Sequence, residues 1–498
     1  MPSNDLSWLV GELRALADDL DANEAQPPLV VAIDQGGHAS RALAFDVRGR
    51  LIAESFAPIS TFRAGADRVE HDPLEIDESV RTALADLHQS LGAEAGRVMA
   101  AGLATQRSSI ACWDTRTNKP LGPILSWQDR RNSGAVERLR AHEAMVRERT
   151  GLVLSPHYGA SKMRWYLEHL DAARAAASKK TLAVGPLAAW LLRSHVKERP
   201  HVVDAVNAAR TQLLDIGSAQ WSEEMLALFG VARELLPAVV PNRHPYGHIS
   251  FGDRLVPLVV CTGDQSAMPF AHGRPDADTI YLNLGTGAFA QRLTTSSETP
   301  TGLLASVLWL EAGDARRIAT TIEGTVNGAA SAIDWLNERV GIDTHRAALA
   351  LTRASAAGTN PPLFLNGISG VGSPYWRPQF ESRFIGEGDA TERLIAVVES
   401  IAFLTCVNIE RMGPSTRILA SGGLAASDYL CDCIATLSGI PVDRTSLQES
   451  TATGLAYLIA GEPTDWQPEA KLGRFAPNED PALRQRFDLW LAQMQAGH

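Results

Sequence analysis

The chain has 498 residues, of which 45% are hydrophobic and 21% charged, and its formal net charge at pH 7 is −11. This length predicts roughly two to four domains, and the composition is that of an ordinary globular protein. The acidic balance without a long basic tract argues against nucleic acid as a partner, and the lack of a long apolar run argues against a membrane span.

The N-terminal residues 1–27 are acidic and lack the basic start of a signal peptide. They predict an amphipathic helix over residues 5–20 that ends in a linker at "QPP". Cysteine is sparse and odd in number, and two of the cysteines are too closely spaced for a usual zinc pair. We therefore expect reduced thiols and a cytoplasmic protein. The five cysteines are Cys112, Cys261, Cys406, Cys431 and Cys433.

The N-terminal half predicts alternating strands and helices. "LVVAID" and "RALAFDVRGRLIAES" indicate consecutive strands of a meander. "EHDPLEIDESVRTALADLHQSL" indicates a helix with Asp72 or Asp77 as its N-cap. "RVMAAGLATQ" indicates another strand, and "KTLAVGPLAAWLLRSH" a strand followed by a helix.

The C-terminal half shows the same alternation and a second glycine-tipped hairpin. "LVPLVVCTGDQSAMPFAHG" predicts a strand, a Gly-Asp turn and a helix, and "TIYLNLGTGAFAQRL" predicts strand, turn and strand. "RILASGGLAASDYLCDCIATLSGIPV" predicts strand, turn, helix and strand, and "ESTATGLAYLIAG" a helix. We expect the residues after 465 to pack loosely. The pattern predicts α/β domains, and the repeated hairpin predicts a duplicated architecture with a cleft between its halves.

The two glycine turns are candidate phosphate sites. Glycine permits positive φ and close approach of backbone N–H groups to an anion. On this interpretation Gly36–Gly37 and Gly285–Gly287 bracket a triphosphate, whereas either turn alone is better explained as an ordinary hairpin. The chain lacks GxxxxGK[ST], which excludes a P-loop. The joint occurrence of both turns with an aspartate at a strand end favours nucleotide binding.

Those aspartates are Asp34 and Asp264. An unpaired buried carboxylate is costly, and a magnesium ion or its bound water would compensate the charge of Asp34. Asp264, where a strand meets a helix, is equally well interpreted as an N-cap or as a general base.

An ordered set of motifs over residues 28–465 resembles the FGGY carbohydrate kinases, nearest to the glycerol-kinase branch. "AIDQGGHASRALAFD" resembles the first phosphate motif and "LNLGTGAF" the second. "VEHDP", "TQR", "SWQDRR", "TGDQSA", "GVGSPYW", "ASGGLAASDYL" and "ESTATGLAYLIAG" follow the family order. The resemblance implies two actin-like (ribonuclease H-like) ATPase domains with an interdomain cleft. We expect them at 28–260 (substrate and phosphate side) and 261–465 (nucleotide side), with extensions at 1–27 and 466–498.

The resemblance also implies an ATP-dependent kinase that transfers the γ-phosphate to a primary hydroxyl of a small polyol or ketose, with Mg²⁺. Related kinases are often homodimers or homotetramers. Asp264 would be the general base, and Asp34 and Asp264 would hold the metal. The implied substrate-binding residues are Gln106, Arg107, Ser108, Trp127, His157, Tyr158, Asp264, Gln265 and Phe289. The implied nucleotide-binding residues are Gly36, Gly37, His38, Arg41, Gly285, Thr286, Gly287, Ala330, Asp334, Gly422, Gly423 and Ser427.

The chain departs from the family pattern around the acceptor. Ser108 replaces a glutamate that accepts hydrogen bonds from substrate hydroxyls, and His157 replaces a tyrosine that touches substrate. His157 is equally well interpreted as a surface or capping residue. Trp127 and Phe289 keep the apolar walls. These changes predict a small polyol or sugar other than glycerol.

The phosphate side departs as well. Gly37 and His38 replace two hydroxyl residues, and Asp334 replaces a glutamine, which predicts weaker ATP binding or a changed nucleotide preference. Three alternatives stay open: glycerol kinase proper, a degenerate actin-like nucleotide-binding regulatory protein, and an unrelated glycine-rich α/β protein. The unusual "GGHAS" turn supports the second of them.

Overall fold

Contacts divide the chain into two compact units, neither of which is continuous in sequence. The structure, a computed structural model, describes residues 11, 26–65, 67–296, 298–312, 317–447, 449–468 and 472–496. Nearly all of the helix predicted over 5–20 lies outside these residues. Unit 1 comprises Met1–Arg274, Ser306–Thr320 and Glu449–Glu469, and unit 2 comprises Pro275–Ala305, Thr321–Gln448 and Ala470–His498. The expected domain limits at residues 27, 260 and 465 stay predictions.

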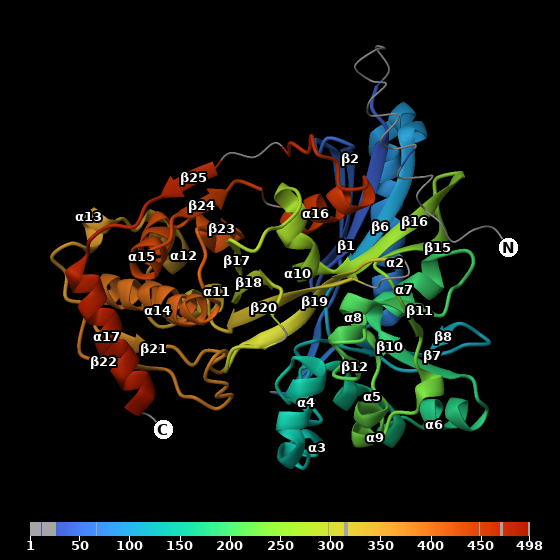
Figure 1. Ribbon diagram of the computed structural model, residues 1–498, viewed down its shortest axis with the longest axis horizontal. Coiled ribbons are helices and arrows are strands. Elements are labelled where there is room, and N and C mark those ends of the chain that lie inside the picture. The colour runs from blue at the N-terminus through green and yellow to red at the C-terminus, as the bar shows by residue number, and fades with distance from the viewer. Residues whose placement is uncertain are drawn as a thin grey trace. The chain divides into compact units, whose positions relative to one another are not determined.

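The main sheet of unit 1 has six strands in the order β15-β16-β6-β1-β2-β3 (Figure 1). The predicted meander is confirmed, because β1, β2 and β3 pair antiparallel. Strands β1, β6 and β16 run parallel, so their carboxyl ends meet at one edge of the sheet. The strands are β1 (Leu29–Gln35), β2 (Ala39–Asp46), β3 (Leu51–Pro58), β6 (Val98–Thr105), β15 (Arg243–Phe251) and β16 (Arg254–Gly263).

Helices cover both faces of this sheet, which explains why every residue of β1 is buried. On one face lie α2 (Pro73–Leu91) and α7 (Leu187–His195). Of the two predicted caps, Asp72 is the N-cap of α2 and accepts a 2.8 Å hydrogen bond from the Leu74 N–H, whereas Asp77 lies within the helix. On the other face α16 (Ser450–Ile459) packs so closely on β6 that a Cβ on Gly102 would lie 2.8 Å from Ile459.

A second sheet in unit 1 has the order β10-β7-β9-β5-β4, with β8 paired to β7. Its strands are β4 (Phe62–Ala64), β5 (Arg68–His71), β7 (Ile110–Asp114), β8 (Lys119–Pro120), β9 (Ile124–Leu125) and β10 (Leu182–Pro186). The helices around it are α3 (Ser133–Glu137), α4 (Glu143–Thr150), α5 (Gly159–His169), α6 (Asp171–Ser178), α8 (Ala205–Ala209) and α9 (Glu223–Phe229). Two short pairs complete this part: β11 (Val202–Asp204) with β14 (Ala238–Val240), and β12 (Leu214–Asp215) with β13 (Gln220–Trp221).

Unit 2 repeats the strand arrangement of unit 1. The seven-stranded sheet has the order β19-β20-β18-β17-β23-β24-β25, and all of it belongs to unit 2 except residues 306–310 of β19 and 318–320 of β20, which belong to unit 1. The hairpin β17–β18 is antiparallel and β23 and β24 follow in parallel, just as β6 and β16 follow the hairpin β1–β2. The predicted duplication is therefore confirmed. The strands are β17 (Thr279–Leu284), β18 (Ala288–Thr294), β19 (Leu304–Leu310), β20 (Ile318–Val326), β23 (Arg417–Ser421), β24 (Val442–Thr445) and β25 (Leu472–Phe475).

The expected loose packing after residue 465 is wrong. Helix α17 (Pro481–Ala496) buries Leu483, Phe487, Trp490 and Met494 in the hydrophobic core of unit 2. These positions recur at helical spacing, so one apolar face of α17 completes that core. The other elements of unit 2 are α11 (Ala330–Asn337), α12 (Thr344–Ala350), α13 (Arg353–Ala356), α14 (Ala390–Arg411), α15 (Asp428–Ser438), β21 (Leu363–Leu365) and β22 (Arg383–Ile385).

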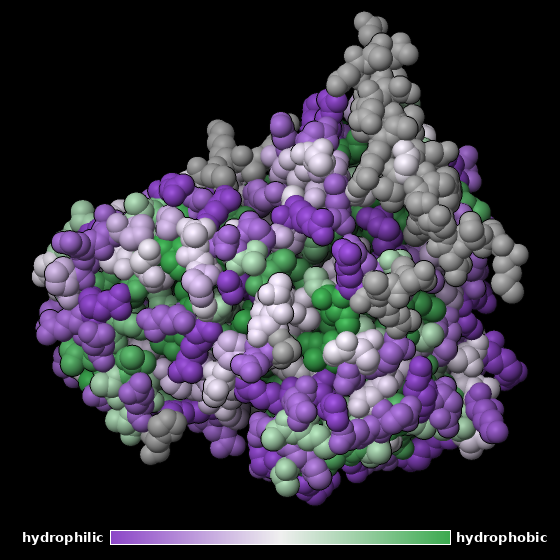
Figure 2. Space-filling view, in the orientation of Figure 1, coloured by the Kyte–Doolittle hydropathy of each residue, from purple (hydrophilic) through white to green (hydrophobic). Residues whose placement is uncertain are grey.

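The thiols lie inside the protein, and its surface is largely hydrophilic. All five cysteines are free and buried. Hydrophilic residues cover much of the face seen in Figure 2, and hydrophobic residues form separate small patches there. Within the described residues, none of the helices combines the length and the apolar character needed to cross a bilayer.

Candidate active site

The carboxyl ends of β1, β6 and β16 bring the two aspartates of the sequence analysis to one edge of the main sheet of unit 1. Asp34 lies opposite Ala104 of β6, and Gly263 at the end of β16 lies opposite Thr105. Asp264 follows directly as the first residue of the short helix α10 (Asp264–Ala267). Both carboxylates belong to unit 1.

Asp34 is buried among charged neighbours, with 7% of its surface exposed. Its pKa is raised to about 7, mainly by burial and then by the negative charge of Asp264, with Arg41 partly offsetting both effects. Arg41 lies directly opposite on β2, with its Nη1 3.9 Å from Asp34 Oδ2. An acid with a raised pKa at a strand end next to a second acid is typical of a functional site.

Glu449 is a site residue that the sequence analysis missed. Its Oε2 accepts a 3.2 Å hydrogen bond from Arg41 Nη1, so one guanidinium serves both Glu449 and Asp34. Burial raises the pKa of Glu449, and its charge adds to the raised pKa of Asp34. The only sequence signal was its position just before the "STATG" helix α16, which packs on β1 and β6.

The carboxylate pair fits a magnesium ion. Mg²⁺ is usually bound by one or two carboxylates together with substrate phosphates and water. Asp34 and Asp264 supply two such oxygens, and a divalent cation beside them would reverse the mutual repulsion that raises the pKa of Asp34. Within the described ranges no group of three or more His, Cys, Asp and Glu side chains could hold a metal, so these residues do not form an all-protein cage.

Asp264 is anchored by its own helix and by Arg107. Its Oδ1 accepts a 2.6 Å hydrogen bond from the Gln265 N–H and lies 3.9 Å from Arg107 Nε. The N-cap of α10 is Gly263, so the N-cap interpretation of Asp264 is wrong. A Cβ on Gly263 would lie 2.5 Å from Arg107 Cγ, which means that the glycine makes room for this arginine. The Thr451 hydroxyl, on α16, donates to the Asp264 carbonyl at 3.3 Å.

A chain of hydrogen bonds connects the first glycine hairpin to the predicted acceptor wall. Gln106 is buried, and its amide donates to Gln35 Oε1 at 3.2 Å and to the Gly36 carbonyl at 3.3 Å. Ser109 Oγ donates to Gln106 Oε1 at 2.9 Å and accepts from the Trp127 N–H at 2.9 Å. The position of Trp127 is therefore coupled to the turn that follows Asp34.

Trp127 and His157 lie side by side. Trp127 is 37% exposed, and its ring is stacked with that of His157 at a centroid distance of 6.5 Å. Burial lowers the pKa of His157 to about 4, so the ring is neutral near pH 7 and Nδ1–H donates to the Trp127 carbonyl at 3.1 Å. His157 thus contacts the predicted acceptor wall. Tyr158 is buried beneath the Arg210 guanidinium, 5.2 Å from the ring centre.

The two glycine turns do not rely on positive φ. The first closes with a 2.9 Å hydrogen bond from Gly36 N–H to the Ala39 carbonyl, and His38 beside it is exposed. In the second, Gly285 N–H donates to the Gly287 carbonyl at 2.9 Å. Neither pair has a left-handed backbone. Gly287 is required by a close approach, because its Cβ would lie 2.9 Å from the Val326 carbonyl oxygen.

The turn in unit 2 rests on the start of α11. The Thr286 carbonyl accepts from the N–H groups of Ala329 at 3.1 Å and Ser331 at 3.2 Å. The Gly285 carbonyl accepts from the Ala330 N–H at 3.1 Å, while the Thr286 residue itself is exposed. The predicted nucleotide residues Gly285, Thr286 and Ala330 are therefore neighbours in the fold.

The remaining predicted nucleotide residues lie in unit 2 with different partners. Gly422 has φ +91°, and a Cβ there would lie 2.5 Å from the Leu284 carbonyl oxygen, whereas Gly423 has open space around it. Ser427 is buried as the N-cap of α15, and its hydroxyl donates to the Ala348 carbonyl at 2.9 Å. Asp334 is exposed and pairs with His345 Nε2 at 2.5 Å. Phe289, predicted as an acceptor wall, lies on β18 of unit 2.

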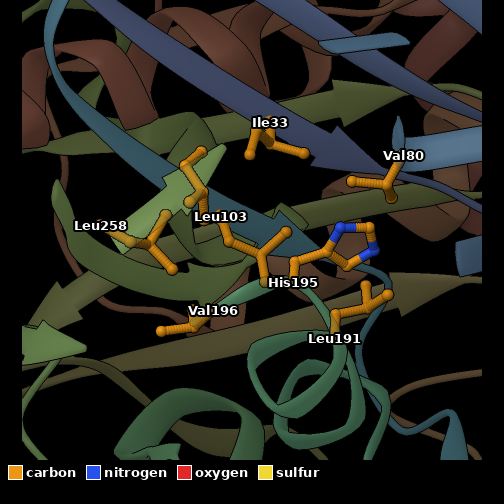
Figure 3. A pocket seen from close by; sticks show the side chains of 8 residues that line it. Ile33, Val80, Leu103, Leu191, His195, Val196 and Leu258 are labelled. Carbon is orange, nitrogen blue, oxygen red and sulfur yellow. The ribbon is translucent and has the colours of Figure 1, made fainter. Parts of the chain in front are cut away.

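A small apolar pocket in unit 1 is separate from this site (Figure 3). Ile33 and Leu103 line it together with residues of α2 and α7. Side chains alternate across a strand, so Asp34 points to the opposite face of the sheet, toward α16. The remaining lining residues are Val80, Leu191, His195, Val196, Ile249 and Leu258.

Comparisons with known proteins agree with this geometry. Residues 29–271 match the N-terminal domain and residues 280–461 the C-terminal domain of the FGGY family of carbohydrate kinases. The chain is 32% identical over 473 residues to a glycerol kinase of Leptothrix cholodnii, covering 88% of this chain and 94% of that protein. A glycerol kinase of Citrifermentans bemidjiense is 32% identical over 444 residues, covering 86% and 89%.

Solved structures show the same fold. Glycerol kinase from Plasmodium falciparum, solved with ADP, superposes with a TM-score of 0.83 at 19% identity, over 94% of this chain and 98% of that chain. A xylulose kinase from Brucella ovis superposes with a TM-score of 0.80 at 21% identity, over the same shares of the two chains. The predicted actin-like two-domain fold is confirmed.

Proposed function

Because this chain belongs to the FGGY family of carbohydrate kinases, which transfer phosphate to an alcohol group, we propose that it moves the γ-phosphate of ATP to a primary hydroxyl of a small polyol or ketose. The observation that carries the proposal is the pair Asp34 and Asp264 at one edge of the unit 1 sheet, with the charge of Asp264 acting on Asp34. The nucleotide is inferred from the family and from the relative solved with ADP.

In this mechanism Asp264 accepts the proton of the attacking hydroxyl. The acceptor oxygen forms the new bond to the γ-phosphorus, the bond from that phosphorus to the β,γ-bridging oxygen breaks, and ADP leaves with the bonding pair. Proton transfer to a positioned base typically contributes about 10²- to 10⁴-fold. Arg107, 3.9 Å from Asp264 Oδ1, keeps the carboxylate in place and adds positive charge beside the acceptor.

Asp34 and Asp264 would hold Mg²⁺, which when bound neutralises charge on the phosphates. Phosphoryl transfer depends mainly on positioning and on such neutralisation. Arg41, between Asp34 and Glu449, contributes a fixed positive charge at the phosphate side. The glycine turn of residues 36 and 37 follows Asp34 directly, so its backbone N–H groups are candidates for phosphate contacts.

The acceptor class is inferred from the residues around Trp127. Ser108 offers a short neutral hydroxyl in place of a carboxylate, and His157 is a neutral imidazole near pH 7. The Ser108 hydroxyl can donate and accept hydrogen bonds, whereas His157, whose Nδ1–H donates to the Trp127 carbonyl, can accept one at Nε2. A donor and acceptors of this kind suit the hydroxyl groups of a polyol or ketose. Glycerol itself is the second candidate, favoured by the curated relatives, which are glycerol kinases.

We expect acceptor-dependent release of ADP from Mg·ATP with at least one small polyol or ketose, and a lower kcat/KM with glycerol. The measurement is a coupled ADP assay over a panel of three- to seven-carbon polyols and ketoses, followed by mass spectrometry of the phosphorylated product. Glycerol as the best acceptor would select the second candidate. ATP binding without transfer to any acceptor would instead favour a nucleotide-binding regulatory protein and contradict the proposal.

A further inference from the structure

Lys162 is a buried lysine between the two segments that carry the acceptor-side departures. It lies on α5 and is 1% exposed, and lysine is rarely buried so completely. Its Nζ donates to the Ser108 carbonyl at 3.0 Å and to the His157 carbonyl at 2.5 Å. One amine therefore joins two loops that are distant in sequence.

The burial of this amine opposes its charge. The pKa of Lys162 is lowered to about 7, mainly by desolvation and to a smaller extent by Arg131, while the charge of Asp129 partly opposes the shift. Asp129 is itself held by Arg131, with Nη2 2.6 Å from Oδ2. A residue that costs this much to bury needs a compensating interaction, and the two carbonyl hydrogen bonds supply it.

Both loops need such an anchor. Ser108 has φ +66°, a left-handed conformation that is unfavourable for a non-glycine residue. His157 lies in a turn just before α5, where its ring contacts Trp127. Without the amine, the Ser108 and His157 carbonyls would each lose a partner, and the two loops would lose the hydrogen bonds through which Lys162 joins them.

We propose that Lys162 is a positioning residue for acceptor selectivity, because it holds Ser108 and His157 in one fixed arrangement beside Trp127. The inference rests on the proposed function, in which Ser108 and His157 face the acceptor. The hydrogen bonds of Lys162 go to the two loops and not to Asp34 or Asp264. Lys162 therefore acts through Ser108 and His157 and not on the transferred proton.

The test is Lys162→Met, which keeps the length of the side chain and removes the donor. We expect the KM for the acceptor to rise about tenfold or more and the preference for the best acceptor over the next to fall by a similar factor, because hydrogen bonds from a charged group are lost on the acceptor side. The KM for ATP should stay within about twofold. A readout without activity is the ¹⁹F spectrum of protein with 5-fluorotryptophan, with Trp127 assigned by Trp127→Phe. The Trp127 signal should move, because His157 moves, while most of the other signals of the 11 tryptophans stay.

Tyr246→Phe is the matched control. Tyr246 is buried in the same unit, and its hydroxyl lies near two main-chain carbonyls, those of Pro241 at 3.0 Å and Asn242 at 3.3 Å. The Tyr246→Phe variant should lose stability without changing selectivity or the Trp127 signal.

If Lys162→Met does not fold, Lys162→Gln keeps one donor and should show smaller changes in acceptor KM, selectivity and the Trp127 signal. Unchanged selectivity and an unchanged Trp127 signal in a folded variant would overturn the proposal. If wild type phosphorylates no acceptor, the proposed function fails, and the Trp127 signal alone decides whether Lys162 positions the loops.

Discussion

Asp264→Asn is expected to lower kcat by about 10²- to 10⁴-fold, the usual contribution of a positioned general base. The amide keeps the size of the side chain. Its carbonyl oxygen can still accept the hydrogen bond from the Gln265 N–H, which in wild type donates to Asp264 Oδ1 at 2.6 Å. It cannot take the acceptor proton. The KM for the acceptor should change much less than kcat, because Arg107 and the walls around Trp127 remain. Steady-state kinetics with the best acceptor of the panel measure both constants.

Asp253→Asn is the control for this prediction. Asp253 is exposed in the turn between β15 and β16, at the far end of the strand that leads to Asp264. The substitution removes the same charge from the same unit and should leave kcat unchanged. A D264N enzyme with wild-type kcat would exclude Asp264 as the base.

Asp34→Asn is expected to abolish measurable turnover and yet to stabilise the protein at alkaline pH. The folded-state pKa of Asp34, about 7, lies above the usual value of 3.8. The folded protein therefore binds this proton more tightly than the unfolded chain. The stability that this tighter proton binding at Asp34 gives the folded protein is fully present below pH 3.8 and is lost as pH rises through about 7. An uncharged amide does not suffer this loss.

The free energy of unfolding of D34N should therefore exceed that of wild type by more at pH 8 than at pH 5. The upper limit of this difference is about 4 kcal/mol, because each pKa unit corresponds to 1.36 kcal/mol. Urea unfolding at the two pH values measures it, with Asp253→Asn again as the control. A D34N protein that is less stable than wild type at pH 8, or a gain that does not depend on pH, would show that Asp34 is not held as a raised-pKa acid.

The strands at the glycine turns could be predicted from the sequence because β1 and β17 are short, largely buried apolar runs that end at such a turn. "LVVAID" and "TIYLNL" became β1 and β17, and the repeated hairpins correctly predicted two sheets of the same topology. For the cap of α2 the sequence left two candidates, Asp72 and Asp77, and the structure selects Asp72, which stands directly before Pro73.

Long-range pairing could not be predicted in the same way. Asp264 was placed in the C-terminal half because it lies far along the chain, but β16 pairs with β6 and therefore belongs to unit 1. Glu449 was missed for the same reason, because its partner Arg41 lies on β2, far away in the sequence. Ser427 was expected at the adenosine, and its hydroxyl is instead bound to the Ala348 carbonyl, a contact between α15 and α12 that no local pattern indicates. Its role toward the nucleotide stays a prediction.

The central claim is that Asp34 and Asp264 act as one charged pair at the edge of the unit 1 sheet. It is tested most directly by ¹³C NMR of the aspartate carboxyl carbons, with the Asp34 signal assigned by Asp34→Asn, over a pH titration of wild type and of Asp264→Asn. The account predicts that Asp34 titrates near pH 7 in wild type and at lower pH once the charge of residue 264 is gone. An Asp34 that titrates near 3.8, or whose pKa does not respond to that substitution, would contradict it.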